Sequence, residues 1–117
     1  EFAWAGSGIL ADDSGYGYVT QVLIKDCRFH NLTTVGIGVA ASGLWKNLEV
    51  IGCYFDNAED GTAPTDYVLC SDNGNTGLFS GNMFATATNA TGVLTIGTGL
   101  KWAANATEAG WSTARPA

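Results

Sequence analysis

The chain has 117 residues, of which 5 are Lys or Arg and 11 are Asp or Glu, so its net charge is −6. This length suits one domain and excludes a multidomain enzyme, and a hydrophobic share of 46% excludes general disorder. The few scattered basic residues exclude a surface for nucleic acid, and no apolar run approaches the roughly 20 residues that span a bilayer.

Short strands are predicted along the whole chain. Sixteen Gly residues interrupt any helical pattern, and the runs between them are rich in Val, Ile, Leu, Thr, Phe and Tyr. The first predicted strand covers residues 8–11. The second begins a unit, residues 22–31, that recurs at residues 48–57 after a shift of 26 without a gap. Residues 77–84 repeat the same template after a further shift of 29.

A second type of strand alternates with these units. Its predicted copies cover residues 35–39, 67–70 and 93–96, and residues 8–11 are an earlier member. Residues 100–105 are a last, degraded copy of the first unit. A fixed period of this length is typical of a coiled chain whose turns stack on one another.

Stacking at strand spacing predicts ladders of residues that share a template position. We expect an aromatic ladder, a ladder of small residues and an aliphatic ladder. The three ladders are Phe29, Phe55 and Phe84; Cys27, Cys53 and Asn82; and Ile24, Val50 and Phe79. Asn31 and Asn57 fit corners of the coil, because Asn bonds nearby backbone groups and tolerates left-handed conformations.

The recurring unit, apolar-x-apolar-x-[Asp/Gly]-[Cys/Asn]-x-Phe, resembles the coils of a right-handed parallel β-helix of the pectate-lyase-like superfamily. The resemblance covers about residues 8–105. It implies an all-β solenoid of about four coils. We take residues 1–105 as the β-helix domain and residues 106–117, which contain Pro and no repeat, as an extended arm. A two-sheet sandwich is the alternative fold.

The three cysteines cannot all pair within one chain. None lies in a Cys-x-x-Cys motif, and the single His30 cannot complete a zinc site. We expect Cys27, Cys53 and Cys70 to be buried thiols, and we expect no metal or cofactor.

The superfamily that the repeat resembles includes enzymes, among them polysaccharide lyases and glycoside hydrolases. Asp12, Asp13, Asp56 and Asp60 are the only plausible acids, but the Asn-Thr-Asp, Gly-His-Gly and Arg-Ile-Lys motifs of polygalacturonase-like hydrolases are absent. The acidic run 56–61 does not have the ligand spacing of an EF-hand and fits a solvated loop better than a calcium site. No catalytic residue is therefore assigned.

Single charged residues offer no alternative site. His30 lacks a nucleophile partner, so we expect it at the surface or a corner. Arg28 lies between two inward-pointing residues, so we expect it to point outward. The chain is accordingly predicted not to be an enzyme.

Four Trp residues fall outside the repeated template, and Trp is enriched at interfaces. We expect an interface at these residues and at one basic residue of the tail: Trp4, Trp45, Trp102, Trp111 and Arg115. For Trp102, in the last coil, burial in the core is equally expected.

Together with the closing run 94–117, this composition resembles structural proteins of tailed-phage particles. The resemblance implies a capsid cement or decoration protein on the virion surface, which binds the major capsid protein or other virion subunits. A short coil has open strand edges at both ends, which favours assembly, most simply as a homotrimer. The alternatives are an extracellular carbohydrate-binding or carbohydrate-cleaving β-helix, such as a tailspike fragment, and a secreted surface module.

Overall fold

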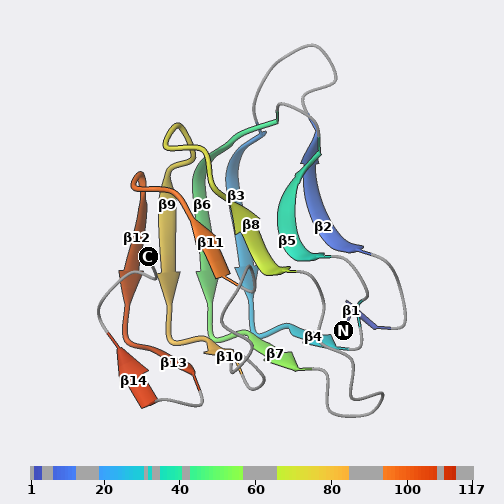
Figure 1. Cartoon of the computed structure of the whole chain (residues 1–117), viewed down its shortest axis with the longest axis vertical. Coiled ribbons are helices and arrows are strands. Elements are labelled where there is room, and N and C mark those ends of the chain that lie inside the picture. Colours follow the sequence, from blue (N-terminus) through green and yellow to red (C-terminus); the bar gives the residue numbers. More distant parts are fainter. Residues whose placement is uncertain are drawn as a thin grey trace.

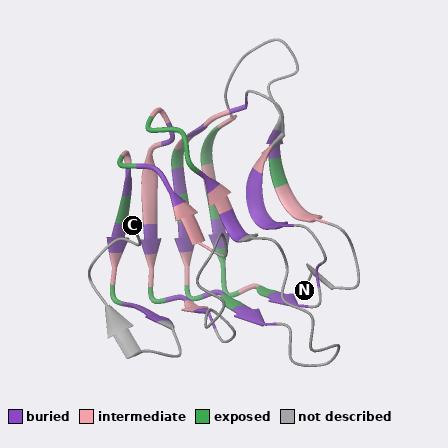
Figure 2. Cartoon of the chain, viewed as in Figure 1, coloured by how far each residue is buried: buried purple, intermediate pink, exposed green. Residues whose placement is uncertain are grey.

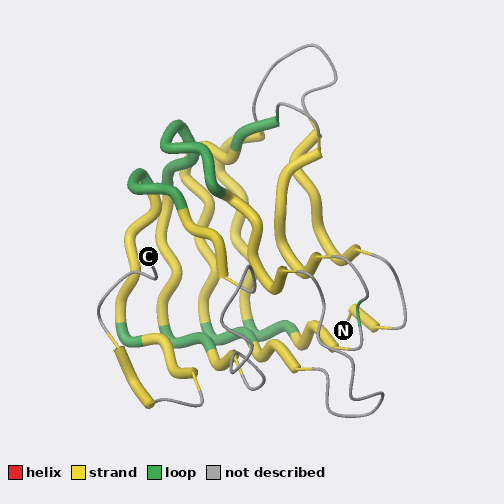
Figure 3. Tube along the Cα trace, viewed as in Figure 1, coloured by secondary structure: helices red, strands yellow, loops and turns green. Residues whose placement is uncertain are grey.

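A computed structural model of the chain describes residues 2–3, 7–12, 19–30, 32, 35–40, 43–56, 66–84, 94–107 and 110–112. These residues form strands, turns and short loops, and no helix (Figures 1 and 3). The strands are β1 (Phe2–Ala3), β2 (Ser7–Asp12), β3 (Val19–Lys25), β4 (Arg28–His30), β5 (Val35–Ala40), β6 (Trp45–Ile51), β7 (Tyr54–Asp56), β8 (Asp66–Cys70), β9 (Gly77–Ser80), β10 (Met83–Phe84), β11 (Leu94–Ile96), β12 (Leu100–Ala103), β13 (Asn105–Thr107) and β14 (Gly110–Ser112).

The strands are arranged in three sheets that the chain visits in turn. Sheet A has the order β1-β4-β7-β10-β13-β14, sheet B the order β11-β8-β5-β2 and sheet C the order β12-β9-β6-β3. Each neighbouring pair is parallel except β13 with β14. One coil therefore runs through sheets C, A and B, as in β3-β4-β5 or β6-β7-β8. This confirms the all-β parallel β-helix and excludes the two-sheet sandwich.

The predicted aromatic ladder fills the interior. The rings of Phe29 and Phe55 are stacked with centroids 4.7 Å apart, and the rings of Phe55 and Phe84 are also 4.7 Å apart. Trp102 continues the column, with its ring 5.5 Å from that of Phe84 and 5.9 Å from that of Phe79. Stacked aromatic pairs contribute roughly 0.5–1.5 kcal/mol beyond the area they bury.

Sheet C carries the aliphatic ladder on its inner face. Ile24, Val50 and Phe79 lie in register on β3, β6 and β9, and all three are buried. Figure 2 shows buried and exposed stretches on the strands of sheet C. In the later part of β6, Leu48 and Val50 are buried while Asn47 and Glu49 are exposed. This period of two is what a wall with one dry and one wet face requires.

Glycine lets sheet B approach the aromatic column. A Cβ added to Gly36 in β5 would lie 2.6 Å from Tyr67 O and 3.2 Å from the ring of Phe55. Gly36 therefore serves packing, because a side chain there would push β5 away from β8 and from the ring of Phe55.

The corner between sheets C and A is built in the same way on every coil. A residue with a left-handed backbone, φ from 53° to 66°, is followed by a Cys or Asn that turns inward. The left-handed residues are Asp26, Gly52, Gly81 and Ala104. The residues that follow them are Cys27, Cys53, Asn82 and Asn105, which we call the corner ladder. Figure 3 shows these corners one after another at the lower ends of the sheet C strands.

The C-terminal region differs from the predicted arm. Ala106 and Thr107 continue β13, which pairs in parallel with β10, and β14 then folds back antiparallel on β13. The described part of residues 106–117 is thus a hairpin strand on sheet A. Residues 108–109 and 113–117, like the predicted corner residues Asn31 and Asn57, lie outside the described residues.

Candidate functional site

An ion pair joins neighbouring coils in sheet A. Arg28 on β4 donates from Nε to Asp56 Oδ2 at 3.0 Å and from Nη2 to the same oxygen at 2.9 Å. The Asp56 side chain is 3% exposed and that of Arg28 is 44% exposed, so the arginine is partly exposed as its predicted outward position requires, and its guanidinium also reaches the buried carboxylate, which was not predicted. Asp56, one of the four candidate acids, therefore binds two coils together.

His30 is buried, at 5% exposure, and lies in register beside Asp56. Of the two expected positions, the surface or a corner, the surface position was wrong for a physical reason, and His30 lies at the end of β4. β4 and β7 are three-residue strands, and each buries its second and third residues, so strict inward and outward alternation does not hold there.

The other candidate acids are not brought together by the described residues. Asp12 is in β2, where only its backbone is described, and Asp13 and Asp60 lie outside the described residues. Within the part of the chain that the structure describes, no three His, Cys, Asp or Glu side chains gather as a metal site would require. The predicted absence of a cofactor stays a prediction.

Polar side chains at the opposite corner brace the coils. Asp72 Oδ1 accepts a hydrogen bond from the Gly74 N–H at 2.6 Å and closes a turn. Asn75, which is fully buried, accepts the Trp45 N–H at 2.8 Å and donates from Nδ2 to Asp72 O at 2.9 Å. The side chains of Asp72 and Asn75 therefore have a structural role, because they form hydrogen bonds within the chain.

The corner ladder contains a chain of buried polar contacts that runs from the second coil to the fourth. Asn82 Oδ1 accepts the Cys53 N–H at 2.8 Å, and Asn82 Nδ2 donates to Val50 O at 2.9 Å and to Asn105 Oδ1 at 2.8 Å. Asn105 repeats the arrangement one coil later, accepting the Asn82 N–H and donating to Phe79 O. Sequence analysis placed Cys27, Cys53 and Asn82 in this ladder correctly.

The thiols differ in their surroundings. Cys53 and Cys70 are buried as predicted, whereas Cys27 is only half-buried. Burial raises the pKa of the Cys53 thiol, and the nearby Cys27 and Asp26 add to the rise. Burial raises the pKa of Cys70 to about 12. A low dielectric disfavours the charged thiolate, so neither buried thiol is an activated nucleophile.

Two of the tryptophans that were predicted to form an interface are buried in the core. Trp45 is 2% exposed, and its indole N–H donates to Gly38 O at 2.9 Å, so it is a core residue that has no surface to offer a neighbouring chain. Trp102 is 8% exposed within the aromatic column, which was the other expectation for it. The side chains of Trp4, Trp111 and Arg115 lie outside those that the structure describes.

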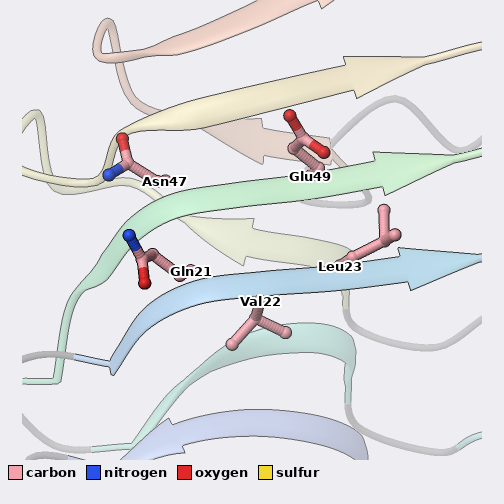
Figure 4. A pocket seen from close by; sticks show the side chains of 5 residues that line it. All are labelled: Gln21, Val22, Leu23, Asn47 and Glu49. Carbon is pink, nitrogen blue, oxygen red and sulfur yellow. The ribbon is translucent and has the colours of Figure 1, made fainter.

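A shallow hollow lies on the outer face of sheet C, with a volume of about 350 Å³ (Figure 4). It is lined by Gln21, Val22, Leu23, Asn47 and Glu49. Gln21 and Asn47, at φ of 57° and 58°, are left-handed residues that lie opposite each other on β3 and β6. Sequence reasoning missed this hollow. Its only signal was a pair of amide residues 26 positions apart, which does not reveal a left-handed backbone.

Large apolar side chains are exposed on all three sheets. Among the described residues these are Leu10 of β2 in sheet B at 41%, Leu23 of β3 in sheet C at 57% and Tyr54 of β7 in sheet A at 42%. Each is separated from the other two by a corner of the coil. The described residues include no helix of the length and apolarity that crossing a membrane requires.

The strand pairing described above shows the parallel β-helix fold. Compared with models of protein families, with curated proteins and with solved structures, the chain matches none of them.

Proposed function

We propose that this chain is a non-enzymatic structural protein of a tailed-phage virion. In this proposal it is a capsid cement or decoration protein that binds the major capsid protein or other virion subunits at the particle surface. It acts as a homotrimer, and its mechanism is adhesion by a rigid column.

The observation that carries the proposal is the use of the buried polar side chains. Asn82 and Asn105 tie successive coils through hydrogen bonds, and Asp56 is tied to Arg28 of the preceding coil. Buried polar networks that are satisfied in this way make a structure rigid. A protein that reinforces a shell needs such rigidity, whereas a glycosidase needs two carboxylates that face a substrate.

The outer faces supply surfaces for neighbours. Leu10, Leu23 and Tyr54 are exposed on three different sheets, so one column can contact more than one subunit. Each contact is small, and strength comes from the many copies on a particle.

The test uses particles of the phage that encodes the chain, prepared without it. We expect the purified chain to bind these particles and to raise the temperature at which they release DNA. Leu23→Glu is expected to weaken binding at least tenfold, while Lys101→Gln, which changes the net charge by the same amount on the same face of sheet C, leaves it within about threefold. A chain that does not bind particles contradicts the proposal.

The trimer is supported by the ends of the sheets. Within the described residues, β3 and β12 each have a neighbour on one side only, and open strand edges favour association. Sedimentation equilibrium is expected to give three times the mass of the chain. A monomer at micromolar concentration contradicts this part of the proposal and leaves particle binding to be judged by itself.

The alternative is a carbohydrate-binding or carbohydrate-cleaving β-helix, and the hollow on sheet C is the observation that favours it. The amides of Gln21 and Asn47 and the carboxylate of Glu49 are groups that bind sugar hydroxyls. An assay of polysaccharide depolymerisation separates the two functions. If the chain cleaves a polysaccharide and Glu49→Gln abolishes the cleavage, the alternative holds and the structural proposal is contradicted. Glu49 is exposed, so this substitution is expected to leave the fold intact.

A further inference from the structure

Cys27 and Cys53 occupy the same position on two neighbouring coils. They immediately precede Arg28 and Tyr54, which pair in parallel register, and the Tyr54 N–H donates to Cys27 O at 2.9 Å. Neighbouring strands lie about 4.8 Å apart, and disulfides join residues whose Cα atoms are roughly 4.4–6.8 Å apart. The backbone therefore places the two cysteines within the reach of a disulfide.

The two sulfur atoms lie on the same side of the corner. The Cys27 thiol donates to Lys25 O at 3.3 Å. The Cys53 thiol contacts Ile24 O, on the preceding coil, at 3.6 Å and Ile51 O at 3.7 Å. Lys25 and Ile51 pair in register, and each lies two residues before the thiol that contacts its carbonyl, so the two sulfur atoms occupy equivalent positions on neighbouring coils. These thiol contacts are weak enough to break.

The two thiols differ in access. Cys27 is half-buried at the corner, whereas Cys53 is 2% exposed. A reagent from solution therefore meets Cys27 first, and Cys53 lies beside it on the inner side. Cys70, fully buried at the end of β8 in sheet B, lies in another wall of the coil and serves as an internal control.

We propose that Cys27 and Cys53 form a disulfide that links the first coil to the second when the protein meets a small-molecule disulfide. The Cys27 thiolate attacks one sulfur of the reagent, whose S–S bond breaks and releases one thiol. Cys53 then gives up its proton to water, turns from Ile24 O and attacks the Cys27 sulfur, which displaces the second thiol. Because burial raises the pKa of Cys53, this second attack is the slow step. Two protein thiols are oxidised, and the reagent is reduced to two thiols.

The link would close a loop of about 26 residues that contains β4, β5 and β6. A cross-link of this kind stabilises a protein mainly by restricting the unfolded chain. It would hold β3, the last strand of sheet C, to the rest of the column. We expect the thermal midpoint to rise by roughly 5–15 °C.

The test treats the folded wild-type chain with oxidised glutathione at pH 8 and counts thiols after denaturation. We expect the count to fall from three to one, with the loss of two hydrogen atoms from the intact mass. Combined digestion with trypsin and chymotrypsin separates Cys53 from Cys70, and the linked peptides are expected to contain Cys27 and Cys53. Cys70→Ser is expected to form the link as the wild type does, and Cys27→Ser is not.

Three results would each overturn the proposal: three thiols that persist, a stable glutathione adduct on Cys27, or a link between molecules or to Cys70. The peptide map is made on the wild-type chain, so it decides the question even if a serine variant fails to fold. The proposal does not depend on the function proposed above, because neither particles nor glycans enter the experiment.

Discussion

The two halves of the corner ladder are built from different side chains. In the third and fourth coils, Asn82 and Asn105 each accept a backbone N–H and donate to a carbonyl of the preceding coil. In the second coil, Cys53 occupies the same position but offers only long thiol contacts to Ile24 O and Ile51 O. The same backbone corner is therefore braced strongly at the C-terminal end and weakly at the N-terminal end.

The comparison teaches that the fold does not need asparagine at every corner. The left-handed residue before each ladder position sets the backbone, and the ladder side chain decides how firmly two coils are held. An amide can accept and donate at once, whereas a thiol is a weak donor and a weak acceptor. The following predictions test this difference, from the largest expected effect to the smallest.

Asn82→Ala is expected to have the largest effect. It removes the acceptor of the Cys53 N–H and the donor to Val50 O, and it leaves these buried groups without partners. Each unsatisfied buried group costs about 1–3 kcal/mol, so we expect a loss of about 4 kcal/mol in the free energy of unfolding, measured in urea. The control is Asn73→Ala, which removes one exposed hydrogen bond from the Thr98 N–H and should cost less than about 1 kcal/mol. Equal losses for the two variants would contradict the role of the ladder.

Alkaline pH is expected to have the next largest effect, through Cys70. Its folded-state pKa is about 12, above the ordinary value of 9.0, because burial disfavours the thiolate. Above pH 9 the unfolded chain loses this proton while the folded chain keeps it, so stability is full below pH 9 and falls as pH rises toward 12. The slope reaches at most about 1.4 kcal/mol per pH unit. Urea unfolding at pH 8 and pH 10 is expected to show a smaller loss in Cys70→Val than in the wild type.

Cys53→Asn is expected to stabilise the chain, because it extends the amide ladder by one coil. The new amide could donate to Ile24 O as Asn82 donates to Val50 O, and could accept the Cys27 N–H. A gain of about 1 kcal/mol is expected for the added hydrogen bonds. Cys70→Asn, in sheet B outside the ladder, buries an amide without such partners and is expected to destabilise. A loss of stability in Cys53→Asn would show that the corner of the second coil differs from that of the third.

Arg28→Met is expected to have the smallest effect. It removes the cation from the ion pair with Asp56 but keeps most of the apolar stem. The arginine is partly exposed, so water weakens the pair, and we expect a cost of about 1 kcal/mol in urea unfolding. Lys25→Met, an exposed cation on the neighbouring strand β3, is the control and should change stability by less than about 0.5 kcal/mol. If Arg28→Met costs as much stability as Asn82→Ala, the ion pair holds the coils together at least as firmly as the ladder does.

Several residues show how far the sequence alone could lead. The spacing of Phe29, Phe55 and Phe84 predicted the aromatic column correctly, because residues that share a template position must stack when coils repeat. Trp45 was misplaced because it lies at the start of a strand, outside the repeated template, where the pattern says nothing about which face it occupies. The hollow at Gln21 and Asn47 was missed because a left-handed backbone at a non-glycine residue has no reliable signature in sequence.

The repeat by itself determined the fold class and most ladder members, because stacking converts a periodic sequence into periodic contacts. That each coil passes through three sheets, and not two, came from the structure. Only the tertiary structure decided the antiparallel return of β14, the burial of His30 beside Asp56 and the pairing of Arg28 with Asp56. These features depend on single contacts between segments at the ends or corners of the coil. There the period of two breaks down, and the packing of each side chain has to be resolved in three dimensions.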